Sequence, residues 1–423
     1  MTSQIKQRIE QIRRGEAPEG YKRTKVGIVP DEWNEECLGK YLQEYKELSN
    51  DIENYPVYSS SRQGLIPQSQ YYDNREAVET NLGYKIVPNG YVTYRHMSDD
   101  DIFHFNVNKT GSEVLVSSEY PVFTSTKKGD LGYLIPMLNG TARFRYFCRT
   151  QKMGGTRTRL YYKNLCTYKT AFATLPEQQK IAEILSTQDK LIALKEKLIE
   201  EKKRQKKYIV HEILSQNIKL QKQDGSKYSQ WDTNNIGAYL TSRNTKQIPT
   251  EDSPLMAFVA DIGVVPKGDR YDRSFLVKSD EKEYKRTELN DFIYSSNNLD
   301  VGSIGLNNYG SAVISVVYEI FSVNSNAIPI VISEIIQMKS NINNILRYRQ
   351  GALYGQYRIF AEDFLSVKID VPSFEEQQEI AKIMLSLEKE IELLQKDLNQ
   401  EKQKKKALVQ LLLTGIVRVQ ENE

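Results

Sequence analysis

Basic side chains gather in one stretch of the sequence that contains no carboxylate. No Asp or Glu occurs from Leu131 to Pro176, and eight Lys and Arg residues give this window a local charge of +8. At its centre, Met153–Arg159 mixes arginine with glycine and threonine. Arginine and amide side chains beside flexible glycines hydrogen-bond well to phosphates and base edges. The window is therefore a candidate nucleic-acid-binding surface, and its candidate DNA-binding residues are Arg143, Arg145, Arg149, Lys152, Arg157 and Arg159.

A second, weaker window of the same kind lies about 200 residues further along the chain. Residues 335–361 also lack Asp and Glu and carry four cations. The candidate DNA-binding residues of this window are Arg347, Arg349, Gln350, Gln356 and Arg358. Turns rich in hydroxyl and amide groups at 59–63, 93–96 and 295–298 are weaker candidates. Both windows also admit the simpler interpretation of a solvated basic face without a ligand, and the sequence leaves that alternative open.

Residue patterns that support catalysis are missing from the sequence. It contains no Asn-Pro-Pro-Tyr motif of the kind that DNA methyltransferases carry. The glycine spacing of Gly263–Asp269 resembles a phosphate-binding loop, but the loop ends in Asp where Lys followed by Ser or Thr is needed. The three histidines lack spaced carboxylates, and the three cysteines are irregularly spaced. We therefore expect a chain that binds rather than catalyses, with no metal or cofactor of its own.

An internal repeat of about 199 residues organises the chain. Gln178, Gln179, Ile181, Ala182 and Ile184 recur as Gln377, Gln378, Ile380, Ala381 and Ile383. The only two tryptophans, Trp33 and Trp231, lie 198 residues apart, each a few residues before an aliphatic–glycine pair. This pattern predicts a tandem duplication of one unit, a globular segment followed by a long helix.

The two long helices carry an apolar seam with steps of three and four residues. In the second helix the seam runs through Ile380, Met384, Leu387, Ile391, Leu394 and Leu398 and is interrupted at Glu401 and Lys405. The first helix keeps Ile181, Leu185, Ile192 and Ile199 but places Gln188 and Lys195 on the seam. Each helix of about 40 residues is about 60 Å long. We expect the two helices to pack against each other; two separate coiled-coil tails for homodimerisation are the alternative.

The first helix has a wider apolar face than the second, because Leu191, Leu194 and Leu198 extend it. Such a face predicts contact with more than one partner. The candidate subunit-binding residues on the two helices are Ile181, Leu185, Leu191, Leu194, Leu198, Ile380, Met384, Leu387, Ile391 and Leu394.

Length and composition set the domain plan. The chain has 423 residues, mean hydropathy −0.56, net charge +3, and no apolar run of membrane-spanning length. In the globular segments, short β-branched and aromatic runs such as 114–116, 120–123, 312–317 and 328–332 are broken by turn residues, which favours mixed α/β domains. We expect a cytoplasmic α+β protein with an N-terminal helical segment (1–24), a first domain (25–175), a first helix (176–215), a linker (216–229), a second domain (230–371), a second helix (372–414) and a tail (415–423).

The sequence resembles the specificity (S) subunits of type I restriction-modification systems. The resemblance rests on the opening Gly20–Trp33, on the Leu-Pro-x-x-Gln entry to the first helix at Leu175–Gln179, and on its counterpart Val371–Gln378. The closing segment Leu412–Arg418 also looks like the end of a chain of this family. The similarity extends over the whole chain in order.

The resemblance implies two target-recognition domains separated by two antiparallel spacer helices, a pseudo-twofold tandem repeat that binds double-stranded DNA. It also implies two methyltransferase (M) subunits docked on the helices, which use S-adenosylmethionine, and restriction (R) subunits that use ATP and Mg. The target would be bipartite and asymmetric, because each domain reads its own half-site. A specificity subunit of a fused methyltransferase–nuclease stays open within the same class. A DNA-binding scaffold or regulator without a methyltransferase partner is the alternative from another class.

Overall fold

The computed structural model describes residues 3–71, 83–152, 156–259, 262–266, 282–297, 299, 304–353 and 356–419. Parts of three segments with sequence motifs lie outside these ranges: 153–155 of 153–159, 267–269 of 263–269, and residue 298 of 295–298. The chain divides into two compact units. The first unit comprises Met1–Lys197 and Gln395–Glu423, and the second unit comprises Leu198–Leu394.

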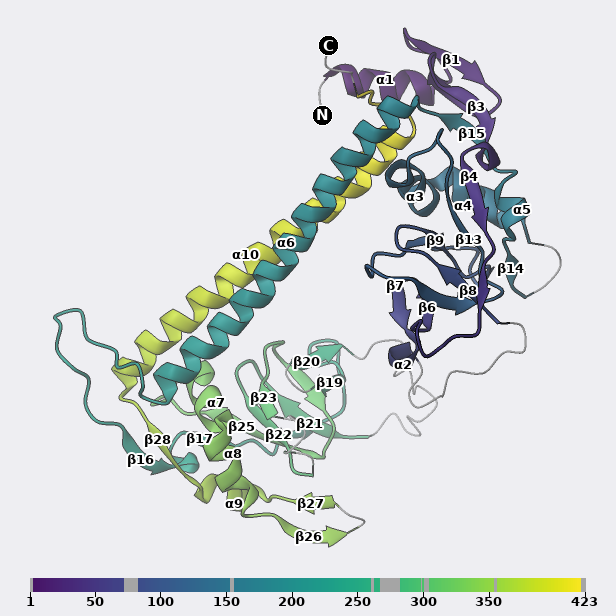
Figure 1. The fold of residues 1–423 in the computed structure, drawn as a ribbon. Helices are drawn as coiled ribbons and strands as arrows, with labels where there is room; N and C mark the ends of the chain where they lie inside the picture. Colours follow the sequence, from purple (N-terminus) through teal and green to yellow (C-terminus); the bar gives the residue numbers. More distant parts are fainter. Residues whose placement is uncertain are drawn as a thin grey trace. The chain divides into compact units, whose positions relative to one another are not determined.

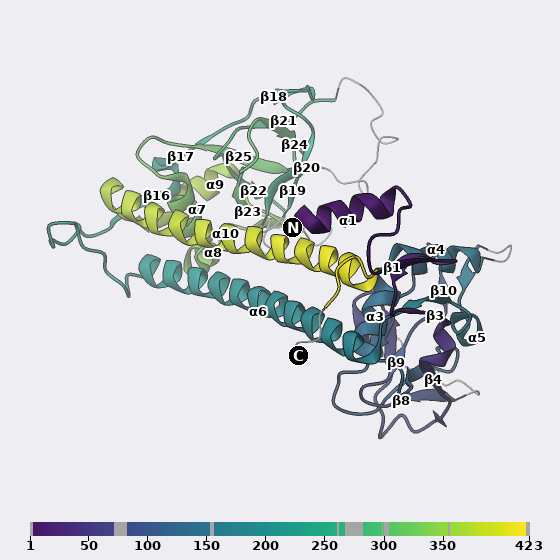
Figure 2. The same cartoon turned by 90° about the horizontal axis from the view of Figure 1, so that it is seen from above.

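Two 40-residue helices, α6 (Leu175–Leu214) and α10 (Phe374–Leu413), run antiparallel and side by side (Figures 1 and 2). Ion pairs between them follow the antiparallel direction, because residue numbers fall along α10 as they rise along α6. In the first unit, Lys195 pairs with Asp397 and Glu196 with Lys402. In the second unit, Lys202 pairs with Glu390 at 2.7 Å and Lys206 pairs with Glu388. The predicted pairing of the two long helices within one chain is thus confirmed.

The polar residues that interrupt the apolar seam have polar partners on the facing helix. Gln188 is buried and donates from Nε2 to Oε2 of Glu401 at 2.6 Å, so these two interruptions meet. Lys195 pairs with Asp397, and Lys405 pairs with Asp189. A polar layer of this kind specifies register, because any shift would leave the groups buried without partners.

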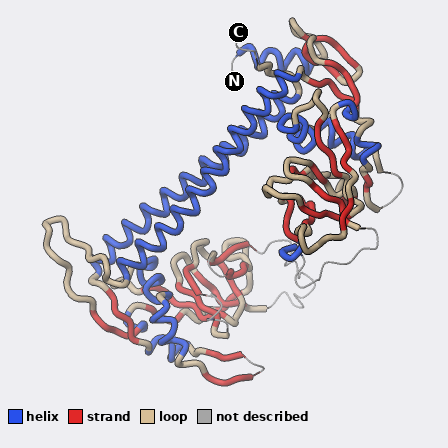
Figure 3. Tube along the Cα trace, in the orientation of Figure 1, coloured by secondary structure: helices blue, strands red, loops and turns tan. Residues whose placement is uncertain are grey.

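The first unit begins with one helix and a series of short strands (Figure 3). These elements are α1 (Ser3–Arg13), β1 (Tyr21–Thr24), β2 (Gly27–Pro30), β3 (Asn34–Cys37), β4 (Leu42–Tyr45), β5 (Leu48–Ser49), β6 (Tyr58–Ser61), β7 (Gly64–Pro67), α2 (Gln68–Tyr71), β8 (Tyr84–Val87), β9 (Val92–Thr93), β10 (Met97–Ser98), β11 (Asn106–Val107), β12 (Val114–Ser117) and β13 (Val122–Ser125). Helices α3 (Leu131–Gly140), α4 (Ala142–Thr150) and α5 (Tyr162–Leu165) follow, with β14 (Thr158–Arg159) and β15 (Lys169–Phe172). The strands form sheets in the orders β11-β9-β13-β4 and β12-β8-β5, plus four two-stranded pairs.

The second unit repeats this plan after α6. Its strands are β16 (Asp232–Asn235), β17 (Leu240–Ser242), β18 (Lys246–Gln247), β19 (Met256–Val259), β20 (Gly263–Pro266), β21 (Tyr284–Thr287), β22 (Phe292–Ser295), β23 (Ile304–Leu306), β24 (Ala312–Ile314), β25 (Tyr318–Val323), β26 (Gln350–Leu353), β27 (Gln356–Arg358) and β28 (Lys368–Val371). Its short helices are α7 (Pro329–Gln337), α8 (Lys339–Leu346) and α9 (Ala361–Ser366). The sheet orders β23-β22-β25-β17 and β24-β21-β18 match those of the first unit strand for strand.

The repeated tryptophan and glutamine make the same contacts in both units. Trp33 donates from its indole nitrogen to Glu177 at 2.8 Å, and Trp231 donates to Glu376 at 3.0 Å. Gln178 accepts the backbone N–H of Asp130 at 3.0 Å, which lies at the start of α3. In the same way, the Gln377 side chain accepts the backbone N–H of Ile328 at 2.9 Å, at the start of α7. The residues that reveal the repeat in the sequence are those that attach each long helix to its globular part.

The surroundings of the two buried carboxylates differ. In the first unit Arg418 donates to Glu177 from Nε at 2.7 Å and from Nη2 at 3.1 Å. Among the described residues no cation pairs with Glu376, and burial raises the pKa of Glu376 even though the Trp231 hydrogen bond opposes the shift. The first carboxylate is therefore neutralised by an arginine, whereas the second is a buried charge with one neutral donor.

One of the short apolar runs that favour mixed α/β domains is helical. Residues 328–332 begin α7, because Pro329 stands in its first turn and Val331, Ile332, Ile335 and Ile336 form its buried face. An apolar run of this length has no periodicity that separates a strand from a buried helix. No helix in the described part of the chain has the length and apolar character that crossing a membrane requires.

Replacing the two equivalent glutamates should change stability in opposite directions. Glu177→Gln removes the buried one of the two carboxylates that pair with Arg418 and leaves it only the exposed Glu32, so we expect the free energy of unfolding of the first unit to fall by about 2 kcal/mol. Glu376→Gln keeps an acceptor for Trp231 and removes an unneutralised buried charge, so we expect the second unit to gain about 1 kcal/mol at pH 7. Because the pKa of Glu376 is raised in the folded state, the wild-type second unit should lose stability as pH rises above about 4.5, and the variant should not.

Urea unfolding followed by tryptophan fluorescence measures both effects, because each unit contains one tryptophan. Trp231→Phe provides the background in which Trp33 reports the first unit, and Trp33→Phe provides the background for the second. Equal losses of stability from the two glutamate variants would contradict the difference described here.

Candidate nucleic-acid interface

Helix α4 presents the first three predicted DNA-binding arginines on its solvent face. Phe144 and Cys148 are buried against the core and Phe147 packs beside them, so these three residues mark the inner face of the helix. Arg143, Arg145 and Arg149 are all exposed, and no carboxylate of the described residues pairs with them. Tyr146 stands among them with 70% of its surface exposed. Unpaired guanidinium groups beside an exposed aromatic ring suit contact with a nucleic-acid backbone.

Beyond α4, the chain returns to the body of the unit through the short strand β14. This strand pairs with β10, with Met97 opposite Arg159 and Ser98 opposite Thr158. Arg159 is exposed, and Lys152, at the end of α4, is exposed as well. Arg157 donates from Nε to Oδ1 of Asp99 at 2.7 Å, so the basic segment lies against an acidic loop. Of the six predicted cations of the first window, three lie on α4 and Arg159 lies on β14, while Lys152 follows α4 and Arg157 precedes β14.

A cavity of about 650 Å³ opens beside this loop. Its walls come from the β6–β7 hairpin, from the segment around β10, and from the residues that follow it. Ser61, Arg62, Arg95, Asp99 and His104 are among the lining residues. Two of the turns that the sequence offered as weaker candidates, 59–63 and 93–96, thus contribute to one polar hollow.

His96 is a structural histidine rather than an exposed contact residue. It is 3% exposed, its ring stacks on Tyr161 with centroids 5.5 Å apart, and its Nε2 lies 3.8 Å from Glu119. Burial lowers the pKa of His96. The side chain therefore fills the wall behind the interface.

The second basic window occupies the equivalent place in the second unit. Leu160 donates its backbone N–H to His96 at 2.8 Å, and Ile359 donates its backbone N–H to Ser296 at 3.0 Å. The hydroxyl groups of Tyr94 and Tyr294 donate to the carbonyls of the same two residues, Leu160 and Ile359. Helices α7 and α8 replace α3 and α4, and the β26–β27 hairpin replaces the basic segment that precedes Leu160.

Most predicted residues of the second window already contact groups of their own chain. Gln350 donates to Asp363 at 2.6 Å, and Arg358 lies 3.4 Å from Glu319 and 4.8 Å from the Phe360 ring centroid. Arg349 stacks 5.7 Å from the ring centroid of Tyr357. Arg347 is exposed at the end of α8, and the side chain of Gln356 lies outside the described residues. The second unit thus offers fewer uncommitted donors than the first.

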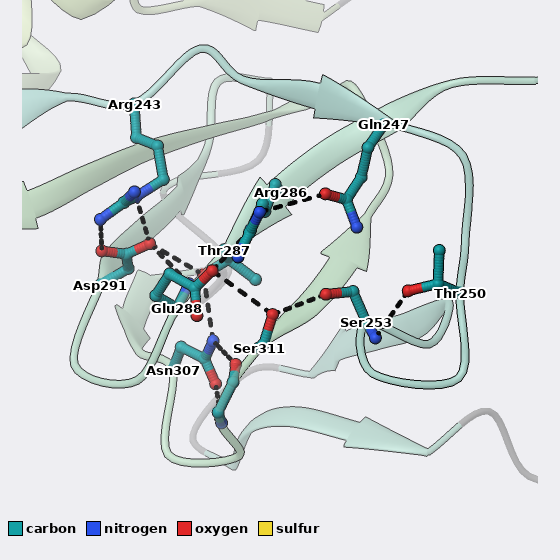
Figure 4. A network of polar contacts seen from close by, with 11 residues as sticks. Arg243, Gln247, Thr250, Ser253, Arg286, Thr287, Glu288, Asp291, Asn307 and Ser311 are labelled. Carbon is teal, nitrogen blue, oxygen red and sulfur yellow. Dashed lines mark hydrogen bonds and ion pairs between the residues drawn. The ribbon is translucent and has the colours of Figure 1, made fainter.

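A polar network below the second unit's surface replaces an aromatic pair of the first (Figure 4). Arg243 pairs with the buried Asp291 at 2.7 Å, and Asn307 donates its backbone N–H to the carbonyl of Asp291. Asn108 makes the equivalent backbone bond to Tyr91, whose ring lies 5.2 Å from that of Tyr45. Arg243 also donates to Asp291 from Nη2 at 3.1 Å, although its buried Nε lacks a hydrogen bond of good geometry. The network links strands of the second unit and supports that domain. The two units have therefore diverged beneath their surfaces as well as on them.

The predicted subunit-binding residues divide into two groups by exposure. Ile181, Leu185, Ile380, Met384 and Ile391 are buried in the chain's own core, and Leu387 and Leu394 are half-buried. In contrast, Leu191, Leu194 and Leu198 are 36%, 65% and 44% exposed. Among the predicted subunit-binding residues, these three leucines are the exposed ones, and their role in subunit binding stays a prediction.

Residues 38–204 and 228–403 match the type I restriction modification DNA specificity domain, once in each copy of the repeat. The chain belongs to this family. The family's domain occurs here in tandem, as the 199-residue repeat predicts, and the α+β fold class with two long antiparallel helices is confirmed. The resemblance found in the sequence is therefore correct.

Several known proteins are similar to this chain over most of its length. The chain is 23% identical over 434 residues to a protein of Methanocaldococcus jannaschii named as the type I restriction enzyme MjaX specificity subunit, which covers 95% of this chain and 97% of that one. A chain from a structure of the complex assembly and conformational transition of the type I R-M system shares the fold, with a TM-score of 0.55, 12% identity, and 92% and 99% coverage. The S subunit of M. genitalium and the HsdS subunit of Thermoanaerobacter tengcongensis each match at a TM-score of 0.47, with 13% identity, 92% of this chain and 97% or 98% of the other.

Removing one arginine of α4 should weaken DNA binding equally for all sequences. We expect Arg145→Ala to lower the slope of log K against log salt by about 0.9, because one phosphate contact and its counterion release are lost. Fluorescence anisotropy of the full chain with a labelled duplex, over 50–200 mM salt, measures the slope. Arg204→Ala is the matched control, since Arg204 is exposed on α6 and pairs with Glu201. A slope that stays the same for both variants would remove α4 from the interface.

Proposed function

We propose that this chain recognises an asymmetric bipartite DNA sequence and directs a methyltransferase to it. The observation that carries the proposal is the match of strand order between the two units combined with the difference of their loops and side chains. Equal scaffolds place equivalent surfaces on DNA, whereas different side chains on those surfaces read different bases. The target therefore has two unlike half-sites.

The long helices are proposed to set the length of DNA between the half-sites. A pair of 40-residue helices is about 60 Å long, and one turn of duplex is about 34–36 Å. Half-sites about one turn apart suit that length when each recognition surface lies inside the helix ends. The bases between them are then not read.

We further propose that the chemistry belongs to partner subunits. The exposed leucines of α6 suit docking of two DNA methyltransferase subunits, which would bring S-adenosylmethionine, and restriction subunits would bring ATP and Mg. This chain then binds DNA and its partners without catalysing a reaction. No group of three or more His, Cys, Asp and Glu side chains in the described ranges is arranged to hold a metal ion.

Deleting the gene should remove one methylated motif from the host genome. We expect single-molecule sequencing to detect a bipartite adenine-methylation motif in the wild type and to lose it in the deletion strain. Restoring the gene should bring the same motif back. A methylome that the deletion leaves unchanged, together with failure of the chain to co-purify with a methyltransferase, would favour a DNA-binding scaffold or regulator instead.

Lengthening the helix pair should lengthen the gap between the half-sites. Insertion of one heptad into both α6 and α10 adds about 10 Å, which corresponds to about three base pairs. We expect the methylated motif to keep both half-sites and to gain that spacing. Insertion of seven Gly and Ser residues into the 216–229 linker is the control, and it should leave the motif unchanged. A heptad variant that methylates the original motif would disprove the role of the helices as a spacer.

A further inference from the structure

Two arginines of the first unit pair with neighbouring aspartates, and one member of each pair, Arg62 or Asp99, lines the 650 Å³ cavity. Arg157 donates from Nε to Asp99 at 2.7 Å, and Arg62, at the β6–β7 turn, donates from Nη2 to Asp100 at 2.5 Å. Both guanidinium groups remain accessible, with side chains 51% and 60% exposed. The two pairs come from three segments that are distant in the sequence and meet only in the fold.

The aspartates belong to a loop that is fixed on both sides. Ser98 donates to Asp100 at 2.9 Å and accepts the backbone N–H of Ile102 at 3.1 Å. Thr158, which is 1% exposed, donates its hydroxyl to Asp101. Strand pairing of β10 with β14 fixes the base of the loop. Carboxylates held in this way can fix the orientation of the arginines that they contact.

The turn that carries Arg62 is fixed as well. Asn106 donates from Nδ2 to the hydroxyl of Ser60 and to the carbonyl of Ser61, both at 2.8 Å. Ser61 in turn donates its hydroxyl to the carbonyl of Gly64 at 2.9 Å. Arg62 therefore extends from a defined hairpin turn rather than from a loose loop.

The hydrogen bond between Nε of Arg157 and Asp99 leaves the two terminal amino groups of this arginine available to DNA. Arg157 uses Nε for Asp99, and its two terminal amino groups have no acceptor among the residues that the structure describes. A guanidinium with a free terminal fork matches O6 and N7 of guanine in the major groove. Lysine cannot reproduce that two-point contact, because it presents a single ammonium group.

The local charge also favours a base over a phosphate. Arg62, Arg95 and Arg157 supply three positive charges, and Asp99, Asp100 and Asp101 supply three negative ones. A phosphate would meet repulsion from these carboxylates, whereas a base edge carries no net charge. The basic helix α4 in the same unit offers phosphate contacts without nearby acid. The unit thus separates a charged backbone-binding face from a polar surface of balanced charge.

We propose that Arg157 and Arg62 read guanines of one half-site, and that Asp99 and Asp100 are positioning residues that orient them. This inference rests on the proposed function and assigns the bases that the first unit selects. It selects Arg62 from the weaker candidate turn at 59–63 and adds the two aspartates, which no sequence pattern indicates.

Variants that keep or raise positive charge separate base reading from phosphate binding. We expect Arg157→Lys and Arg62→Lys each to relax one guanine position of the same half-site, with discrimination reduced by about 5- to 150-fold. Asp99→Asn should relax the position that Arg157→Lys relaxes, although it removes a negative charge near DNA. A phosphate contact predicts the opposite, because lysine would substitute for arginine and Asp99→Asn would tighten binding at every sequence.

The methylated motif in cells carrying each variant gene gives the first readout. Binding of the purified chain with its methyltransferase to duplexes changed at single bases gives the second. Arg13→Lys and Asp31→Asn are matched controls on exposed residues of the first unit and should preserve the motif. The other half-site is an internal control, since a folded complex must still select it.

Each outcome decides the inference. Relaxation of a guanine in one half-site, with the other half-site intact, supports it. An unchanged motif in both lysine variants, a half-site without guanine, or tighter binding of Asp99→Asn at all sequences overturns it while the proposed function stands. A wild-type strain without a bipartite motif overturns the proposed function itself.

Discussion

The antiparallel pairing of α6 and α10 is the constraint on which the remaining structure depends. The start of α6 contributes Ile181 and Leu185 to the first unit's core, and the end of α10 contributes Leu412 to the same core. The second unit's core receives Ile213 from the end of α6 and Ile380 from the start of α10 in the same manner. Neither core is complete without both helices. The polar layer at Gln188 and Glu401 fixes the register of the pair, and with it the residues that each core receives.

Each globular part is attached to its helix by a small set of buried polar contacts. Trp33 with Glu177, and Trp231 with Glu376, join the strand region to the first turn of the long helix. Gln178 and Gln377 join that turn to the starts of α3 and α7, respectively. Interactions of this kind are costly to break when buried, so they hold position while the exposed loops vary. The recognition surfaces can therefore diverge without loss of the scaffold.

Divergence has gone furthest on the surfaces proposed to meet DNA. The first unit combines unpaired arginines on α4 with arginines that aspartates hold at a cavity rim. In the second unit, Gln350 donates to Asp363 and Arg358 pairs with Glu319. Below the surface, the Arg243–Asp291 pair stands where the first unit stacks Tyr45 on Tyr91. Two domains that differ at this level would not select the same bases, which agrees with an asymmetric target.

The sequence by itself determined the repeat, the two long helices and the basic windows, because each is a local pattern of spacing or charge. The apolar seam around Ile380 and Met384 and the eight cations of residues 131–176 can be identified from the sequence. The sequence could not show that Arg157 lies against Asp99, nor that residues 328–332 begin a helix. Those features depend on strand pairing between distant segments and on burial, and only the tertiary structure decides which side chains become neighbours.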